Sequence, residues 1–515
     1  MCKSKILNSL NSVFSFVFIF IFIQVIIGTK ANYSYFAFTD TWKIVSILLL
    51  LLVVCYFFFK INNKYREKMF YCLCIGWICI QIIYVYTSYA QNGSDAYVVN
   101  YYAYWNRIKE IEDFYYCYLA QYQNNIGLTY IISLVYKFLR IFISFTFDQT
   151  WIILAIISAI CCNLSIIFTV LFSRIYLGRK YDCLALIFAC TLIGMSEEGL
   201  VFYSDIISLW TIPCFFFLIV LVINEKRIKI QFIEYVLMGG VLGIGGWLKP
   251  QVIICFIALM CYLIVSNELL RKKVYIFLTV GIILLFTKNS LSFLSVNWYQ
   301  KSVSGKIENE KQFMEDNRFP MLHWMNLGMN YESLGAYNLD DVNNTEKIVG
   351  IDSKNDYLKN SIKNRLMSHS LTEWLIFINN KVVYSLQNGT YSAKKIWKEK
   401  SMNNSHWAKT VQNYIDPANE LYFNHFGIWV QCVYCLCFAG LIKTSKDNKK
   451  RIENNDVVQY IGEIALIGVV LFLILFEQNI RYFYSFIPLV IVLGIKGTIQ
   501  YNFWKRPLKS INEKI

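Results

Sequence analysis

Residues 203–223 have the sequence YSDIISLWTIPCFFFLIVLVI, in which Asp205 stands directly before a run that contains no charged residue. A second aspartate, Asp95, follows the apolar run 69–89 in the sequence Ser94-Asp95-Ala96. A helix needs about 20 mostly apolar residues to cross a bilayer, so both runs predict membrane helices. An unsolvated charge at the edge of hydrocarbon is costly and usually functional. The two aspartates therefore indicate a candidate site where the membrane helices end.

The composition is that of an integral membrane protein. Hydrophobic residues make up 57% of the 515 residues and charged residues only 16%, against about 25% charged residues in soluble proteins. The net charge of +15 does not predict a nucleic-acid partner, because the lysines and arginines lie in short segments between apolar runs. Most of the cysteines lie inside those runs, where Cys behaves as a small apolar residue, so no disulfide framework or zinc site is expected.

The hydropathy pattern predicts an all-α polytopic membrane protein with about 12 transmembrane helices. The expected spans are 9–28, 44–59, 69–89, 150–172, 183–196, 206–223, 232–248, 251–266, 274–291, 426–442, 457–476 and 482–498. The first run has no small-residue cleavage site after it, so it predicts an uncleaved anchor.

Charge then predicts the orientation. With a cytoplasmic N-terminus, the inner segments are 60–68, 174–182, 224–230, 267–273, 443–456 and 501–515. Each has a net charge of +2 or +3, which fits the positive-inside rule. Both termini are therefore expected in the cytoplasm, with 90–149, 197–205, 293–425 and 477–481 outside.

The chain divides into three expected parts. Residues 1–292 form a transmembrane module that includes the outer loop 90–149, residues 293–425 form an extracytoplasmic lid domain, and residues 426–515 form the last spans and a cytoplasmic tail. The apolar segment 126–147 is interrupted by Lys137 and Arg140. We therefore expect a juxtamembrane helix there, on or in the outer leaflet, after an amphipathic helix that follows Asp95.

Each aspartate has two interpretations. Asp95 can act as a general base on an acceptor hydroxyl or amine, or it can cap a helix or lie solvated in a loop. Asp205 can orient substrate or bind a metal together with Glu197 and Glu198, or it can cap the helix that follows it.

Two cations lie at the expected outer surface, Lys249 between two apolar runs and Arg481 in the last outer turn. Lys249, before Pro250, can bind a phosphate or reach toward the membrane surface beside a helix break. Arg481 is suited to phosphate recognition, and Glu477 can pair with it across the last outer turn, a contact of little energetic value if exposed.

The lid segment contains His323 and Trp324, which can form a carbohydrate subsite or anchor the lid internally. The sequence contains no Walker motif, dinucleotide-binding glycine pattern or nucleophile elbow. Chemistry driven by a nucleotide is therefore not expected.

Several short motifs resemble those of one enzyme superfamily in their order and common sidedness. They are Asp95 with its amphipathic helix, YQNNIGLT at 122–129, YSD at 203–205, WLKP at 247–250, HWMNLGM at 323–329, GAY at 335–337, NGTY at 388–391 and Glu477 to Arg481-Tyr482. Over residues 69–500 the layout resembles the GT-C superfamily of membrane glycosyltransferases, near the protein O-mannosyltransferase and lipid A aminoarabinose transferase branch.

The resemblance implies an inverting transferase that takes its sugar from a polyprenyl-phosphate donor. Asp95 would be the catalytic base and Asp205 the second acidic group, while Lys249 and Arg481 would hold the lipid phosphate. His323 and Trp324 would line the sugar or acceptor pocket. The same motifs add further expected substrate-binding residues: Asn125, Glu477 and Tyr482. The acceptor would be a surface glycopolymer, lipid or protein, with the bilayer as a further partner; a divalent metal ion stays open as a cofactor.

The chain departs from the family pattern at two places. Many relatives have Asp-Glu where this chain has Asp95-Ala96, and Asn124-Asn125 replace a Glu-Lys-Pro-type sequence of the aminoarabinose branch. Two other functions are open: a capsule or O-antigen polymerase, and a flippase or transporter for a lipid-linked sugar. Transporters place charges near the bilayer midplane, whereas the apolar runs here are nearly free of them, which favours an enzyme.

Overall fold

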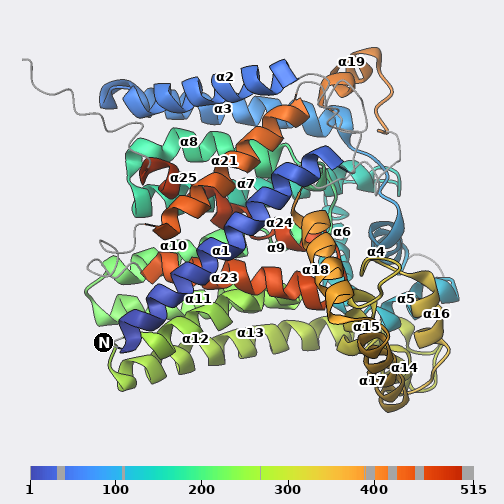
Figure 1. The fold of residues 1–515 in the computed structure, drawn as a ribbon. Helices are drawn as coiled ribbons and strands as arrows, with labels where there is room; N and C mark the ends of the chain where they lie inside the picture. The colour runs from blue at the N-terminus through green and yellow to red at the C-terminus, as the bar shows by residue number, and fades with distance from the viewer. Residues whose placement is uncertain are drawn as a thin grey trace, which may run out of the picture.

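The computed structural model describes residues 2–31, 41–106, 111–266, 268–387, 389, 401–415, 426–446 and 457–500. These residues are almost entirely helical, and the β-structure among them is two isolated bridges, Ala90–Ser401 and Ser304–Ile307. Most of the long helices run side by side in one bundle, with the N-terminus at one end (Figure 1). The prediction of an all-helical chain is confirmed.

Within the described ranges, six helical segments are long and apolar enough to cross a membrane. They are α3 (Asn63–Ser88), α7 (Thr150–Leu177), Ser204–Asn224, α11 (Ile228–Leu248), α13 (Leu270–Val303) and α23 (Val457–Leu475). The third comprises α9 (Ser204–Ser208) and α10 (Thr211–Asn224). Shorter apolar stretches lie in α1 (Cys2–Ala31), α2 (Thr41–Lys60), α12 (Ile254–Val265), α21 (Ile428–Lys446) and α25 (Ile487–Gln500).

The expected span 183–196 is not one continuous α-helix. It begins as α8 (Asp182–Ala189) and continues as a π-helical turn, Cys190–Gly194. Ala185, Ala189 and Leu192 are fully buried, so this short segment lies within the bundle. The described residues thus contain six long apolar helical segments and a set of shorter apolar helices, and the count of about twelve spans stays a prediction.

The outer surface of the bundle is apolar. Ile78, Ile82, Ile264 and Phe286 are 52%, 64%, 74% and 70% exposed. Exposed apolar groups on this scale are unusual on a water-facing surface and normal on one that faces lipid, where helices satisfy their main-chain polar groups internally.

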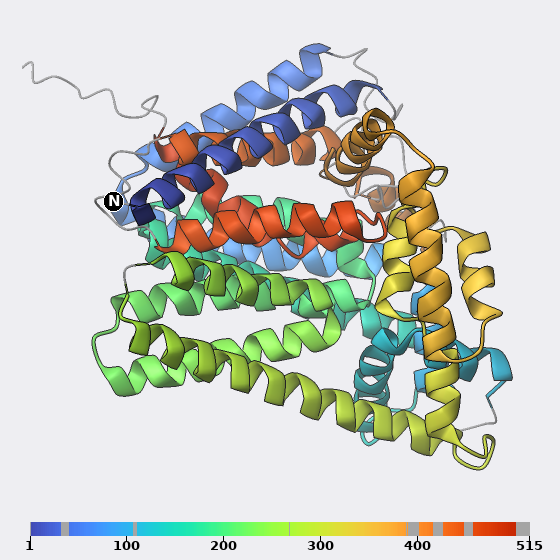
Figure 2. The same ribbon diagram turned by 60° about the horizontal axis from the view of Figure 1, so that its bottom comes forward.

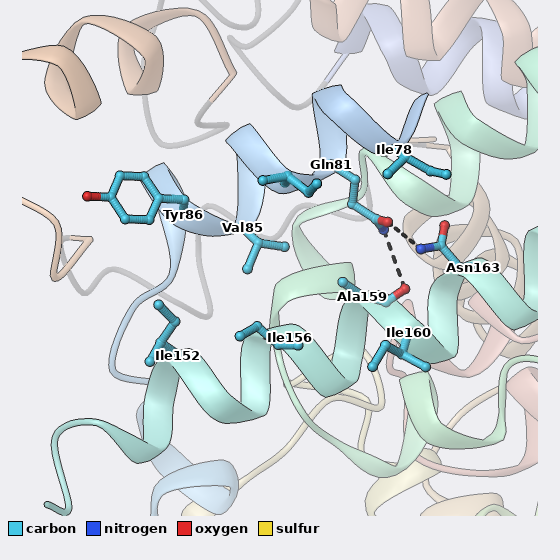
Figure 3. Close-up of a pocket in the computed structure, with 10 residues that line it drawn as sticks. Ile78, Gln81, Val85, Tyr86, Ile152, Ile156, Ala159, Ile160 and Asn163 are labelled. Carbon is cyan, nitrogen blue, oxygen red and sulfur yellow. Dashed lines mark hydrogen bonds between the residues drawn. The ribbon is translucent and has the colours of Figure 1, made fainter. Parts of the chain in front are cut away.

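An apolar groove of about 370 Å³ lies between α3 and α7 (Figure 3). At its base the Asn163 amide donates to Gln81 Oε1, and Gln81 Nε2 donates to the Ala159 carbonyl at 3.4 Å. The Trp77 indole donates to Asn163 Oδ1 at 2.9 Å. These polar groups satisfy one another, as groups between membrane helices must, and they fix α3 against α7.

The expected outer loops gather at the end of the bundle away from the N-terminus (Figures 1 and 2). The first contains α4 (Ser94–Trp105), α5 (Asp113–Gln121) and α6 (Ile126–Leu139). The second contains α14 (Glu310–Asn317), α15 (Met321–Gly328), α16 (Leu339–Glu346), α17 (Ile351–Met367), α18 (Leu371–Leu386) and α19 (His406–Ile415). Because α6 has only 14 residues, the segment 126–147 does not form one membrane-spanning helix. The expected lid boundary at 292/293 falls inside α13.

Glycines bring α11 close to α13. A Cβ at Gly239 would lie 2.7 Å from the Val280 carbonyl oxygen, and one at Gly243 would lie 2.7 Å from Thr287 Cβ. This four-residue spacing of small residues is typical of tightly packed membrane helices. Gly240, on the neighbouring position, has no heavy atom within 4 Å of the same point.

We therefore expect Gly239→Val to destabilise the bundle and Gly240→Val to be tolerated. The added side chain at position 239 must displace main chain of α13, an overpacking that costs about 1–3 kcal/mol. Thermal unfolding of the two purified variants in detergent measures the difference. Equal midpoints would show that α11 and α13 are not packed this closely.

Candidate functional site

The candidate site lies at the end of the bundle where the helices α4 to α6 and α14 to α18 gather. Four elements meet there: the start of α4, the 3₁₀ turn Gln123–Asn125, the start of α9 and the short helix α24 (Arg481–Tyr484). The end of α11, at Lys249, joins them. The site is therefore assembled from segments far apart in the sequence.

Asp95 lies in the first turn of α4, where the helix dipole favours a carboxylate. The N-cap position is Gly93, with no side-chain cap bond, so Asp95 does not have the capping role considered above. The residue before it, Ser94, has a φ of +56°, a left-handed conformation that is unfavourable for a non-glycine residue and common at functional sites. Asp95 is half-buried, so its carboxylate is reachable.

Tyr203 connects Asp95 to the rest of the site. Its hydroxyl lies 3.2 Å from Asp95 Oδ2 and 3.0 Å from Asn125 Oδ1, so its single proton is shared between two acceptors. The Asn125 amide in turn donates to the Tyr118 hydroxyl at 2.8 Å. Burial, followed by the Asp95 charge, raises the pKa of Tyr203 well above its usual value. Tyr203 is therefore a neutral donor that orients the Asp95 carboxylate.

Asp205 forms a buried ion pair with Lys249. Asp205 Oδ1 lies 2.8 Å from Lys249 Nζ, with the two side chains 1% and 9% exposed. The Asp205 carboxylate accepts no main-chain hydrogen bond within the described part of the chain, and Tyr203 occupies the N-cap position of α9. The helix-cap interpretation of Asp205 is therefore wrong, because its carboxylate faces the lysine.

The two cations lie over aromatic rings. Lys249 Nζ is 5.3 Å from the centre of the Tyr203 ring and 5.1 Å from that of Tyr482. The Arg481 guanidinium is 5.1 Å from the centre of the Tyr203 ring, and its Nε donates to Asn479 Oδ1 at 3.2 Å. Both cations thus gather at the face of Tyr203, while Asp95 lies at its hydroxyl.

Glu477 is buried and accepts a hydrogen bond from the Tyr482 hydroxyl at 3.1 Å. Burial raises the pKa of the Glu477 carboxyl, and the Tyr482 bond and the Arg481 charge oppose that shift. The alternative interpretation, an exposed ion pair between Glu477 and Arg481, is therefore wrong about exposure, because the Glu477 side chain is buried in the site.

Lys381 on α18 fixes the segment that presents Glu477. Its fully buried ammonium donates to the main-chain carbonyls of Gly328, Ile474 and Phe476. The Gln478 N–H donates to the Gly335 carbonyl at 2.6 Å, and Gly335, with a φ of +75°, has no room for a Cβ beside Lys381 Nζ. These contacts join the lid helices to the end of α23.

The rings of His323 and Trp324 lie 5.3 Å apart, centre to centre, but the two side chains differ in burial. His323 is fully buried within the lid, stacked on Phe319 at 4.3 Å, with Nδ1 3.0 Å from the Thr345 hydroxyl. Trp324 is half-buried, and its ring centre lies 5.9 Å from that of Tyr122. Tyr122 directly precedes the turn Gln123–Asn125 of the site, so Trp324 lies toward the site, whereas His323 has the arrangement of an internal anchor.

Seven of the nine expected site residues thus meet around Tyr203: Asp95, Asn125, Asp205, Lys249, Glu477, Arg481 and Tyr482. Tyr203 itself, with Tyr118 and Tyr122, was not expected as part of the site. The sequence signal was present, since Tyr203 stands two residues before Asp205.

The described residues show no geometry that would support a metal site. Among the described residues, no three or more His, Cys, Asp or Glu side chains gather closely enough to hold a metal ion. The side chains of Glu197 and Glu198, which the metal interpretation of Asp205 used, lie outside the described part of the chain, as do Asn388, Thr390 and Tyr391.

Comparison with known proteins places the chain in a membrane family. A family model described as "Conserved hypothetical integral membrane protein" matches residues 3–500. No curated protein and no solved structure matches the chain.

We expect the stability of the protein to depend on the buried ion pair between Asp205 and Lys249. Lys249→Met should leave Asp205 as an uncompensated buried charge, which costs about 3–5 kcal/mol, and the thermal midpoint of the purified protein should fall. The double variant Asp205→Asn/Lys249→Met removes both charges and should recover part of the loss. A single variant as stable as the parent protein would contradict the pair.

Burial of His323 should make the stability of the lid depend on pH. Burial lowers the pKa of His323 to about 4, whereas an exposed histidine has a pKa of about 6.5. Between these values the unfolded chain binds a proton that the folded lid does not, so lid stability should decrease as the pH falls from about 6.5 to 4.

Hydrogen exchange of the segment 321–346 across this pH range measures the effect. His323→Gln should remove most of the pH dependence, while His406→Gln, which changes an exposed histidine on α19, should leave it intact. Identical pH profiles for the two variants would contradict the prediction.

Proposed function

We propose that this chain, which belongs to that family of integral membrane proteins, is a glycosyltransferase. It would move a sugar from a polyprenyl-phosphate-linked donor to a surface glycopolymer, lipid or protein on the extracytoplasmic face. The observation that supports this most is the arrangement around Tyr203: a reachable carboxylate at its hydroxyl and two cations over its ring.

Asp95 has the position that a general base needs. It is half-buried, it lies at a helix N-terminus, and Tyr203 holds one of its oxygens at 3.2 Å. The other oxygen can accept the proton of an acceptor hydroxyl. As that proton moves to Asp95, the acceptor oxygen bonds to the anomeric carbon, and the bond from that carbon to the phosphate oxygen breaks with its electron pair. Attack from the opposite face inverts the anomeric centre.

Arg481 is the cation best suited to the leaving phosphate. Lys249 already shares its charge with Asp205 at 2.8 Å, so a phosphate there would compete with a carboxylate. The planar guanidinium can bind two phosphate oxygens at once, and a cation where negative charge develops lowers the barrier. We therefore assign the phosphate mainly to Arg481 and treat Asp205 as a positioning residue that acts through Lys249.

Aromatic side chains border the proposed sugar position. Trp324 and Tyr122 lie 5.9 Å apart, and Tyr337 is 55% exposed. Partial burial, the Asp95 charge and the Glu477 charge raise the pKa of Tyr337. Such rings can pack against the apolar face of a sugar while their polar atoms bind its hydroxyls.

The test is the substitution Asp95→Asn, which keeps the size of the side chain and removes the base. Loss of general-base catalysis should reduce transfer by about 10²–10⁴-fold. Transfer is measured as surface sugar by glycan analysis, at matched expression of the protein in the membrane.

The matched control is Asp113→Asn, an exposed aspartate in the first turn of the neighbouring helix α5. This variant should retain transfer. Normal glycosylation in the Asp95→Asn variant would rule out Asp95 as the base.

A further inference from the structure

A pocket separate from the proposed active site lies between α4 and α6. It has a volume of about 170 Å³ and is lined by Ala103, Ser133, Lys137 and Arg140. Ala103 stands eight residues after Asp95 on α4, which is roughly 12 Å along the helix axis. Residues 133, 137 and 140 recur at four- and three-residue spacing, so they share one face of α6.

The pocket presents two positive charges. Lys137 is exposed, and it forms no ion pair with any residue that the structure describes. The Arg140 guanidinium lies 4.6 Å from the centre of the Tyr104 ring and 5.4 Å from that of Phe145. Its Nη2 donates to the Tyr104 carbonyl at 3.3 Å, so the arginine is held in place while the lysine can move.

The surroundings of the pocket are apolar. On α6 and the turn after it, large apolar side chains stand exposed: Leu134 44%, Phe138 60%, Ile141 71%, Phe142 68% and Ile143 51%. The opposite side of α6 packs against α4 and α13. A helix with an exposed apolar face and cations beside it is typical of one that lies in the membrane interface.

We propose that this pocket binds the phosphate of an anionic phospholipid. The volume of about 170 Å³ is several times the roughly 30 Å³ of one water molecule in the liquid, which leaves room for a phosphate and the atoms bonded to it. Lys137 and Arg140 supply the charge, and the Ser133 hydroxyl lies at the buried wall. The exposed apolar side chains accept the acyl chains, which a free anion would not need.

This binding would fix α6 to the bilayer surface and, through α6, the position of α4. Because α4 begins at Ser94 and Asp95, the lipid would hold the helix that presents the proposed base. Lipid binding here needs no sugar transfer, because the pocket and the exposed apolar side chains around it are present whatever reaction the site around Tyr203 performs.

The experiment titrates the purified full-length protein with phosphatidylglycerol and with phosphatidylcholine and follows bound lipid by native mass spectrometry. Phosphatidylglycerol should bind more tightly. A basic residue near an anionic surface contributes about 1 kcal/mol, so Lys137→Gln should weaken phosphatidylglycerol binding about fivefold, and Lys137→Gln/Arg140→Gln should weaken it further.

Two more variants complete the design. Ala103→Leu fills the pocket without changing its charge and should also weaken binding, whereas Lys311→Gln removes an exposed lysine on α14 and should not. Because Lys137 is exposed, its substitution stays informative even if a variant at Arg140 fails to fold.

Equal binding of the two lipids, or equal effects of Lys137→Gln and Lys311→Gln, would overturn the proposal. Inorganic phosphate that displaces the lipid at the lipid's own concentration would identify a free-anion site instead and would overturn the lipid assignment.

Discussion

Lys249 ends α11, Asp205 lies in the first turn of α9, and the 2.8 Å contact between them is buried. A lone charge in this place would be very costly, so the two helix ends must stay together. Tyr203 precedes Asp205, and its ring is therefore held under Lys249 and Arg481. Its hydroxyl then meets Asp95 from a different part of the chain. The geometry of the whole site depends on this one pair.

In a membrane, a few polar groups are enough to determine how the helices pack. Apolar helices cannot be sorted by hydrophobic burial in lipid, so close packing and paired polar groups decide which helices meet. Close packing at glycines brings α11 and α13 together, and the hydrogen-bonded amides of Gln81 and Asn163 join α3 to α7. Lys381 joins α18 to its neighbours at the end of the bundle that holds the candidate site, where three main-chain carbonyls from two elements accept hydrogen bonds from its ammonium.

Features of the fold that depend on residues close together in the chain could be predicted from the sequence. Apolar length predicted the helices, and Lys137 and Arg140 correctly excluded a span over 126–147. The sequence did not show that the run 183–196 ends in a π-helical turn, because the composition of this run matches that of a full membrane span. The capping role of Asp205 failed for a similar reason: Ser-Asp before a helix is good local chemistry, but a lysine 44 positions later competes for the carboxylate. Tyr203 and Lys381 act only through distant partners, which spacing along the chain cannot reveal.

We propose that the cluster around Tyr203 breaks a bond in a lipid-linked sugar. The most direct measurement gives the purified protein, in lipid nanodiscs, a polyprenyl-phosphate sugar labelled in the sugar and an extract of surface acceptors. This reaction requires release of polyprenyl phosphate together with transfer of the label, and we expect Arg481→Gln to lose both. Donor that stays intact, or that crosses the bilayer of a vesicle unbroken, would contradict the proposal and would identify a transporter.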